Sequence, residues 1–186
     1  MDKICLVSLN VNGLCGDERL AQLKTHLEVE GDPDIVFLQE IHSNNREVIK
    51  KWEQCLSKYK CYFGHGDGRN KGTGILVKKI TPFYLNLNGM VQDLDGRYTI
   101  LRGVLGERLV TLVSVYAPVE RIERDGYFGR LLSNNLDGVL YLMGDYNSAV
   151  SKVKDRTYNR NRTREDTELI DFMQKSRYQR SMEAFA

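Results

Sequence analysis

Apolar and polar positions along the chain repeat with two different periods, which predict alternating strands and helices. Residues near 17–30, 44–58 and 164–175 place apolar side chains at helical spacing, and 121–134 fits either a helix or a loop. Continuous or alternating apolar runs, typical of strands, lie near 3–9, 34–40, 60–64, 73–79, 83–88, 97–104, 109–116 and 138–144. This mixture of elements predicts an α/β protein.

The helix expected over 44–58 contains the single tryptophan of the chain. Its inner stripe is predicted to consist of Val48, Trp52, Cys55 and Leu56. Trp52 is therefore expected in the core and not on a surface that stacks on bases.

Several predicted strands end in polar side chains, where α/β proteins usually gather their sites. The residues delivered in this way are Asn10, Asn12, Glu40, Tyr116, Asp145 and Asn147. Residues two apart on an extended chain project to the same face, so Asp145 and Asn147 are expected to reach one phosphate or one attacking water. Taken singly, each residue also has a structural explanation, because Gly-Asp-x-Asn is good turn chemistry and a tyrosine before Ala-Pro is often a half-buried anchor.

These strand ends form motifs with a fixed order along the chain. The motifs are LNVNGL at Leu9–Leu14, QEIH at Gln39–His42, GTGILV at Gly72–Val77, YAP at Tyr116–Pro118 and GDYN at Gly144–Asn147. From residue 3 to about 175 the chain thereby resembles the endonuclease/exonuclease/phosphatase superfamily of metal-dependent phosphodiesterases. Within that group it is most similar to the apurinic-type endonuclease domain of LINE-type (non-LTR) retrotransposons.

The resemblance implies a fold and an activity. The fold is a four-layer α/β sandwich of two facing mixed β-sheets flanked by helices (DNase I-like), formed by a single domain over 1–186. The implied activity is Mg2+-dependent (or Mn2+-dependent) nicking of target DNA. A reverse-transcriptase domain is the expected partner in the full-length element, and the nucleus is the expected compartment.

The resemblance also assigns roles to the strand-end residues. Mg2+ prefers oxygen ligands and keeps several waters, so one or two carboxylates suffice. Glu40 is the main expected metal ligand, assisted by the amide oxygen of Asn10. Asp145 would orient or deprotonate the water, Asn147 would hold the water or a phosphate oxygen, and Tyr116 would stabilise charge on the phosphate or leaving group.

Three features of this sequence complicate the assignment. Asn12 stands where relatives often have a carboxylate, which lowers the negative charge of the site. His42 matches the retrotransposon type, but a hydrogen bond to a loop explains it equally well. Relatives also carry a late Asp and a final Ser-Asp-His, which the sequence as far as Ala186 does not contain. We therefore expect a domain that is incomplete at its C-terminus, lacks its last strands and is impaired as a nuclease.

Formal charge is only +2, so no global field points to a nucleic-acid partner. The segment 152–164 is nevertheless rich in Lys and Arg, with Asp155 as its acid. We predict DNA contacts by Arg156, Arg160 and Arg162 in this segment and by Arg97 at the head of a strand. The alternative for segment 152–164 is a solvated loop without a DNA contact. The alternative for Arg97 is a position at the exit of a β-turn. An inactive retroelement remnant that only binds nucleic acid through the basic segment is the competing interpretation of the whole chain.

The remaining composition points to an intracellular protein. The four cysteines lack the paired spacing of zinc sites, so we expect them to be reduced. No segment approaches the roughly 18 apolar residues of a membrane span, and no signal peptide is apparent. We expect neither a membrane nor a small-molecule cofactor as a partner.

Overall fold

The structure is a computed structural model, which describes residues 3–42, 45–64, 71–124, 126–148, 171 and 173–174. The chain divides into two compact units. The first consists of Met1–Tyr116 with Asp137–Asp145, and the second of Ala117–Leu136 with Tyr146–Ala186. Both β-sheets belong to the first unit. The expectation of a single domain over 1–186 stays a prediction.

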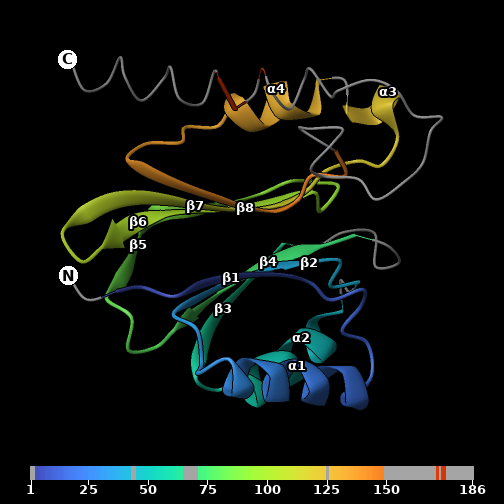
Figure 1. The fold of residues 1–186 in the computed structure, drawn as a ribbon, viewed down its shortest axis with the longest axis vertical. Helices are drawn as coiled ribbons and strands as arrows, with labels where there is room; N and C mark the ends of the chain where they lie inside the picture. Colours follow the sequence, from blue (N-terminus) through green and yellow to red (C-terminus); the bar gives the residue numbers. More distant parts are fainter. Residues whose placement is uncertain are drawn as a thin grey trace. The chain divides into compact units, whose positions relative to one another are not determined.

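The first sheet is formed by the N-terminal strands of the chain (Figure 1). Its strands, in spatial order, are β1 (Leu6–Asn10), β2 (Ile35–Gln39), β4 (Thr73–Lys78) and β3 (Tyr59–Gly64). β1 and β2 run parallel, whereas β4 is antiparallel to both of its neighbours. Helices α1 (Asp17–Val29) and α2 (Arg46–Cys55) pack against one face of this sheet.

The second sheet carries the later strand ends. Its strands, in spatial order, are β5 (Phe83–Gln92), β6 (Tyr98–Leu105), β7 (Arg108–Tyr116) and β8 (Val139–Asp145). β7 and β8 run parallel, and the other neighbours are antiparallel. The pairing of β5 with β6 shifts register between Leu85 and Met90.

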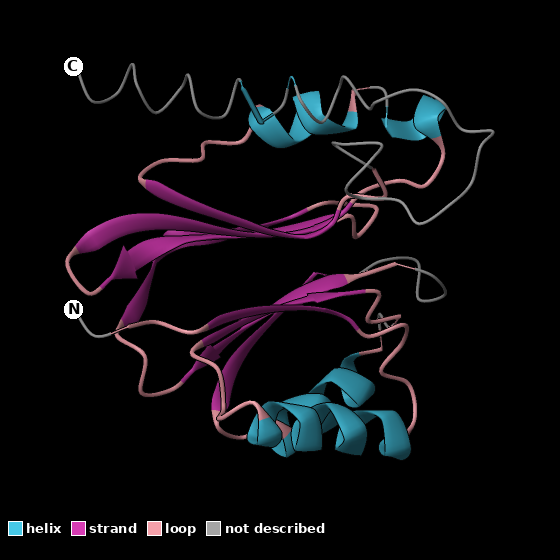
Figure 2. Cartoon of the chain, in the orientation of Figure 1, coloured by secondary structure: helices cyan, strands magenta, loops and turns pink. Residues whose placement is uncertain are grey.

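The two sheets face each other and enclose an apolar core (Figure 2). This core consists of Ile35, Phe37, Ile75 and Val77 from the first sheet and Phe83, Leu101, Leu105, Val110 and Leu112 from the second. Two facing mixed sheets with helices confirm the predicted fold class.

A second core lies between the first sheet and its two helices. Trp52 is 1% exposed and meets Phe63 edge-on, so its predicted core position is confirmed. The predicted stripe of α2 was wrong in one respect, because Ile49 is buried while Val48 and Cys55 are only partly buried. Ile49, Trp52 and Leu56 follow the i, i+3, i+7 spacing of one helix face, and Val48 and Cys55 flank it.

In the part of the second unit that the structure describes, two short helices have defined bounds. These are α3 (Arg121–Arg124) and α4 (Tyr127–Leu132), where the sequence allowed a helix or a loop. Arg124 Nη1 donates to the carbonyl oxygen of Pro118 at 2.9 Å, which ties α3 to the chain before it. The helix predicted near 164–175 lies mostly outside the described residues. Among the helices that the structure describes, none has the length and apolar character needed to cross a membrane.

Candidate active site

Four of the predicted site residues lie at the carboxyl ends of strands in the first unit. Asn10 and Tyr116 end β1 and β7, Asp145 ends β8, and Glu40 directly follows β2. In the parallel pair β7–β8, Tyr116 lies opposite Asp145. Parallel strands deliver their carboxyl ends to one edge of a sheet, so each sheet contributes two of these residues at its own edge.

The amide of Asn10 joins the contributions of the two sheets. Its Nδ2 donates to Glu40 Oε1 at 2.8 Å and to Asp145 Oδ2 at 3.2 Å. Both carboxylates are therefore close neighbours, although Glu40 follows a strand of the first sheet and Asp145 belongs to the second. Asn10, Glu40 and Asp145 thus meet at one place in the first unit, and Tyr116 lies opposite Asp145.

Glu40 is held from several sides. Its Oε2 lies 3.2 Å from His42 Nε2, and its carbonyl oxygen accepts from Gly13 N at 2.6 Å. Glu40 and His42 have φ angles of 57° and 56°, in the left-handed region that side chains rarely adopt. Such conformations cost about 1–3 kcal/mol each and cluster at functional sites. The backbone after β2 therefore adopts a strained bend. This bend places the His42 imidazole against the Glu40 carboxylate.

Tyr116 presents a neutral phenol to the Glu40 carboxylate. Burial raises its pKa, the charge of Glu40 and a hydrogen bond to it raise the pKa further, and Arg97 opposes these effects. The phenol therefore keeps its proton at neutral pH and is a donor, not a base. Arg97 Cζ lies 5.1 Å from the centroid of the Tyr116 ring, and Arg97 O accepts from Tyr116 N at 2.8 Å. The Arg97 guanidinium thus lies over the Tyr116 ring, and its contact with DNA stays a prediction.

The orientation of the Asn10 amide bears on its expected role as a ligand. Its Oδ1 accepts from Asn12 N at 3.1 Å, which turns the NH2 group toward the carboxylates. A cation held by Glu40 favours the opposite orientation, with the amide oxygen toward the ion. Ligation by Asn10 stays a prediction.

Other predicted residues lie elsewhere or outside the described region. Asn147 belongs to the second unit, where its Nδ2 donates to Ala117 O at 2.8 Å. Its proposed contact with water or phosphate therefore stays a prediction. Arg156, Arg160 and Arg162 lie outside the described residues.

The sequence did not indicate two contributions to this region. Arg19 Nη1 donates to Asn12 O at 2.9 Å and so fixes the backbone after β1 from helix α1. Gln39 is 1% exposed and donates to Ser114 Oγ at 3.1 Å. A polar residue inside an apolar strand run was the available signal for Gln39. The sequence around Arg19 gives no such signal, because an arginine on the polar face of a predicted helix is usually exposed to solvent.

The donor set can be compared with the requirements of a metal. Within the described part of the chain, no group of three or more His, Cys, Asp or Glu side chains could hold an ion. The two neighbouring carboxylates of Glu40 and Asp145 suit Mg2+ or Mn2+, which accept few protein ligands and retain water. The residues therefore fit a hydrated divalent cation better than a closed zinc site.

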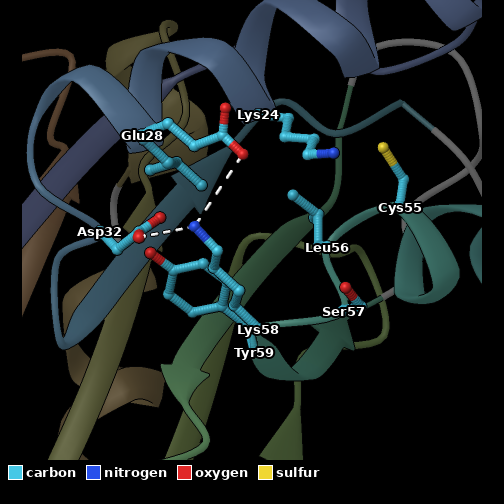
Figure 3. Close-up of a pocket in the computed structure, with 9 residues that line it drawn as sticks. Lys24, Glu28, Asp32, Cys55, Leu56, Ser57, Lys58 and Tyr59 are labelled. Atoms are coloured by element: carbon cyan, nitrogen blue, oxygen red, sulfur yellow. Dashed lines mark hydrogen bonds and ion pairs between the residues drawn. The ribbon is translucent and has the colours of Figure 1, made fainter.

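A separate pocket of about 100 Å³ lies between the last turns of α1 and α2 and the start of β3 (Figure 3). Its charged groups pair mainly with one another, since Lys58 Nζ lies 2.7 Å from Asp32 Oδ2 and 3.9 Å from Glu28 Oε1. None of the predicted site residues lines it. The strand-end group remains the candidate active site.

Comparisons with known proteins identify the family of the chain. The chain is 28% identical over 178 residues to the 5'-tyrosyl-DNA phosphodiesterase of Caenorhabditis elegans, covering 82% of this chain and 46% of the relative. It thus spans about half the length of the curated relatives it matches.

Solved structures show the same fold. The TDP2 structure from Caenorhabditis elegans aligns with a TM-score of 0.56 and 24% identity, covering 85% of this chain and 50% of that one. An AP endonuclease from Archaeoglobus fulgidus aligns with a TM-score of 0.60 and 20% identity, covering 83% and 62%. The profile of the Endonuclease/Exonuclease/phosphatase family matches residues 7–173. The chain therefore belongs to the endonuclease/exonuclease/phosphatase family.

Proposed function

We propose that this chain is a divalent-metal-dependent phosphodiesterase that cleaves DNA at the strand-end site. The observation that carries the proposal is the shared hydrogen bonding of Asn10 Nδ2 to Glu40 and Asp145. Carboxylates that share one donor across two sheets are costly to assemble for stability alone, because their negative charges repel. Membership of a phosphodiesterase family supplies the reaction class.

In this proposal Glu40, with help from Asn10, would hold Mg2+ or Mn2+. The ion, when bound, would neutralise charge that develops on the phosphate. Asp145 would orient the attacking water and accept its proton. Tyr116 would donate a hydrogen bond to a phosphate or leaving-group oxygen and so stabilise its charge, and Arg97 would add positive charge beside it.

The sequence motifs suggest the biological setting. We infer from LNVNGL and QEIH that the chain is the endonuclease part of a LINE-type retrotransposon, which nicks target DNA in the nucleus beside a reverse-transcriptase domain. Asn147 would hold the water or a phosphate oxygen. Arg156, Arg160 and Arg162 would contact the DNA backbone.

A second candidate function is hydrolysis at a DNA end rather than inside a strand. The similarity to 5'-tyrosyl-DNA phosphodiesterases supports it. The same groups would serve, because both reactions break a phosphodiester. The two functions differ in the leaving group, which is a deoxyribose oxygen for nicking and a tyrosine phenolate for the end reaction.

The test uses two substrates under the same conditions. Supercoiled plasmid reports nicking, and an oligonucleotide with a 5'-phosphotyrosyl end reports end hydrolysis, each with Mg2+ and with EDTA. We expect Mg2+-dependent conversion of plasmid to open circles. Faster turnover of the oligonucleotide would favour the second candidate. Binding of DNA without cleavage of either substrate would overturn both and favour the inactive remnant.

A further inference from the structure

The apolar core between the two sheets ends, next to the site, in a layer of buried polar side chains. We call this layer the polar belt; it consists of Gln39 on β2, Thr73 on β4, Thr99 on β6 and Ser114 on β7. Each of these residues is at most 1% exposed. Gln39 lies opposite Thr73 in the first sheet, and Thr99 lies opposite Ser114 in the second.

Hydrogen bonds of the belt cross from one sheet to the other at two places. Gln39 Nε2 donates to Ser114 Oγ at 3.1 Å, and Ser114 Oγ donates to Leu38 O at 2.9 Å. The hydroxyl oxygens of Thr73 and Thr99 are 2.8 Å apart, and Thr99 Oγ1 is also 3.3 Å from Thr73 O. All four side chains therefore have partners, as a buried polar network requires.

The belt has room for these contacts because of a glycine on the neighbouring strand. A Cβ added at Gly64, which pairs with Thr73, would lie 2.3 Å from Thr99 Oγ1. Any side chain at position 64 would displace the Thr99 hydroxyl. The absence of a side chain at Gly64 therefore leaves room for the contact between the Thr73 and Thr99 hydroxyls.

Stability alone does not explain a polar layer here. Replacing both partners of a buried hydrogen bond by apolar groups of the same shape is often nearly neutral. Hydrogen bonds differ from apolar contacts in their narrow range of distance and angle. A hydrogen-bonded layer therefore restricts the separation and register of the two sheets more tightly than aliphatic side chains would.

The belt lies directly beneath the residues of the candidate site. Gln39 immediately precedes Glu40, Ser114 is separated from Tyr116 by one residue, and Thr99 is separated in the same way from Arg97. Glu40 depends on the first sheet and Tyr116 on the second, so a shift between the sheets changes the distances within the site directly.

We propose that the polar belt positions the active site by fixing the spacing of the two sheets at the edge where Glu40 and Asp145 meet. The proposal rests on the proposed function for its catalytic consequence. None of the four belt residues is assigned a contact with the substrate, so they are positioning residues and not catalytic ones.

The test compares belt variants with a control in the same sheet. Thr99→Val and Ser114→Ala each remove one hydroxyl from the belt, whereas Thr99→Ser keeps it. Thr111→Val is the control, because Thr111 is also fully buried on β7 but donates to Asp137 O at 2.7 Å on the opposite face of the sheet. It removes a comparable hydrogen bond outside the belt.

Two measurements are made on each folded variant. The first is the single-turnover nicking rate at saturating DNA and Mg2+, together with DNA affinity. We expect Thr99→Val and Ser114→Ala to lower the rate by about 10- to 100-fold at unchanged affinity, since a misplacement of about 1 Å has effects of that size. Thr99→Ser and Thr111→Val should keep most of the rate.

The second measurement is amide hydrogen exchange, which needs no activity. The N–H groups of Gly13 and Tyr116 donate to Glu40 O and Arg97 O at the edge of the site. In the belt variants, the exchange of these two amides should accelerate about tenfold or more relative to the most protected core amides. In Thr111→Val it should not accelerate. Should one belt variant fail to fold, Thr73→Val replaces it.

The outcomes separate the two proposals. A wild-type protein that cleaves neither substrate contradicts the proposed function, while the exchange comparison still decides whether the belt orders the edge. Equal effects of Thr111→Val and the belt variants on both measurements would show a general role in stability and overturn the positioning role.

Discussion

At the scale of single residues, the candidate site depends on the contacts of the Glu40 carboxylate. Glu40 accepts from Asn10, lies against His42 and affects the pKa of Tyr116. Its side chain is 19% exposed, so it is accessible enough to bind a hydrated ion. Glu40 therefore has the largest expected influence on metal binding.

Glu40→Gln should weaken Mg2+ binding sharply and leave the fold intact. The substitution removes the negative charge while keeping the shape, and a strand-end side chain contributes little packing. Titration calorimetry with Mg2+ measures the affinity, and circular dichroism checks the fold. Glu18→Gln, at an exposed position in the first turn of α1, is the matched control. Unchanged Mg2+ affinity in Glu40→Gln would remove this residue from the metal site.

At the scale of elements, the sequence predicted most of what positions the site. The ends of β1, β2, β7 and β8 were predictable because each is a compact apolar run that stops at a polar residue. β5 runs to Gln92, beyond the predicted end at 88, because the register shift between Leu85 and Met90 breaks the alternating pattern.

Contacts between elements were not predictable in the same way. The bond between Gln39 and Ser114 joins residues 75 positions apart, and it depends on how one sheet lies on the other. The contact of His42 with Glu40 depends on two left-handed backbone conformations that no local pattern signals. The strand-end pattern and the motifs therefore indicated the candidate site residues, but they did not indicate the groups that orient them.

Helix α2 offers a prediction at this scale. Asn45 caps its first turn, since the side chain accepts from Glu47 N at 2.9 Å. Asn45→Ala should lower the free energy of unfolding by about 1 kcal/mol, because it leaves a donor of the first turn without its partner. Urea denaturation measures the change, with Lys50→Ala at an exposed position of the same helix as the control. Equal stability of the two variants would contradict the capping role.

At the scale of the whole molecule, buried acids couple the fold to pH. Burial raises the pKa of the Cys61 thiol to about 12, and burial also raises the pKa of the Tyr59 phenol to about 12. Both groups belong to the first unit and pack in the core between the sheet and its helices. In the unfolded chain their ordinary values are 9.0 and 10.0.

These shifts predict a loss of stability in alkaline solution. Above pH 9 the unfolded chain loses the Cys61 proton while the folded protein keeps it, so the folded state binds more protons and stability falls as pH rises toward 12. Below pH 9 this contribution is fully present. Urea midpoints measured from pH 7 to 10.5 should decline above pH 9, and the decline should be shallower in Cys61→Ala and Tyr59→Phe. Identical slopes in all three proteins would show that other groups cause the decline.

For the molecule as a whole, the proposed function requires that Glu40 and Asp145 act together in one catalytic centre. Single-turnover nicking of supercoiled DNA with Mg2+ should be measured for Glu40→Gln, Asp145→Asn and the double variant at equal folded concentration. Because both carboxylates share the Asn10 amide and act as one unit, each single substitution should lower the rate by about 10² to 10⁴. The double variant should then lose little more. Losses that multiply in the double variant would show that the two carboxylates work independently, and the single centre proposed for this protein would be contradicted.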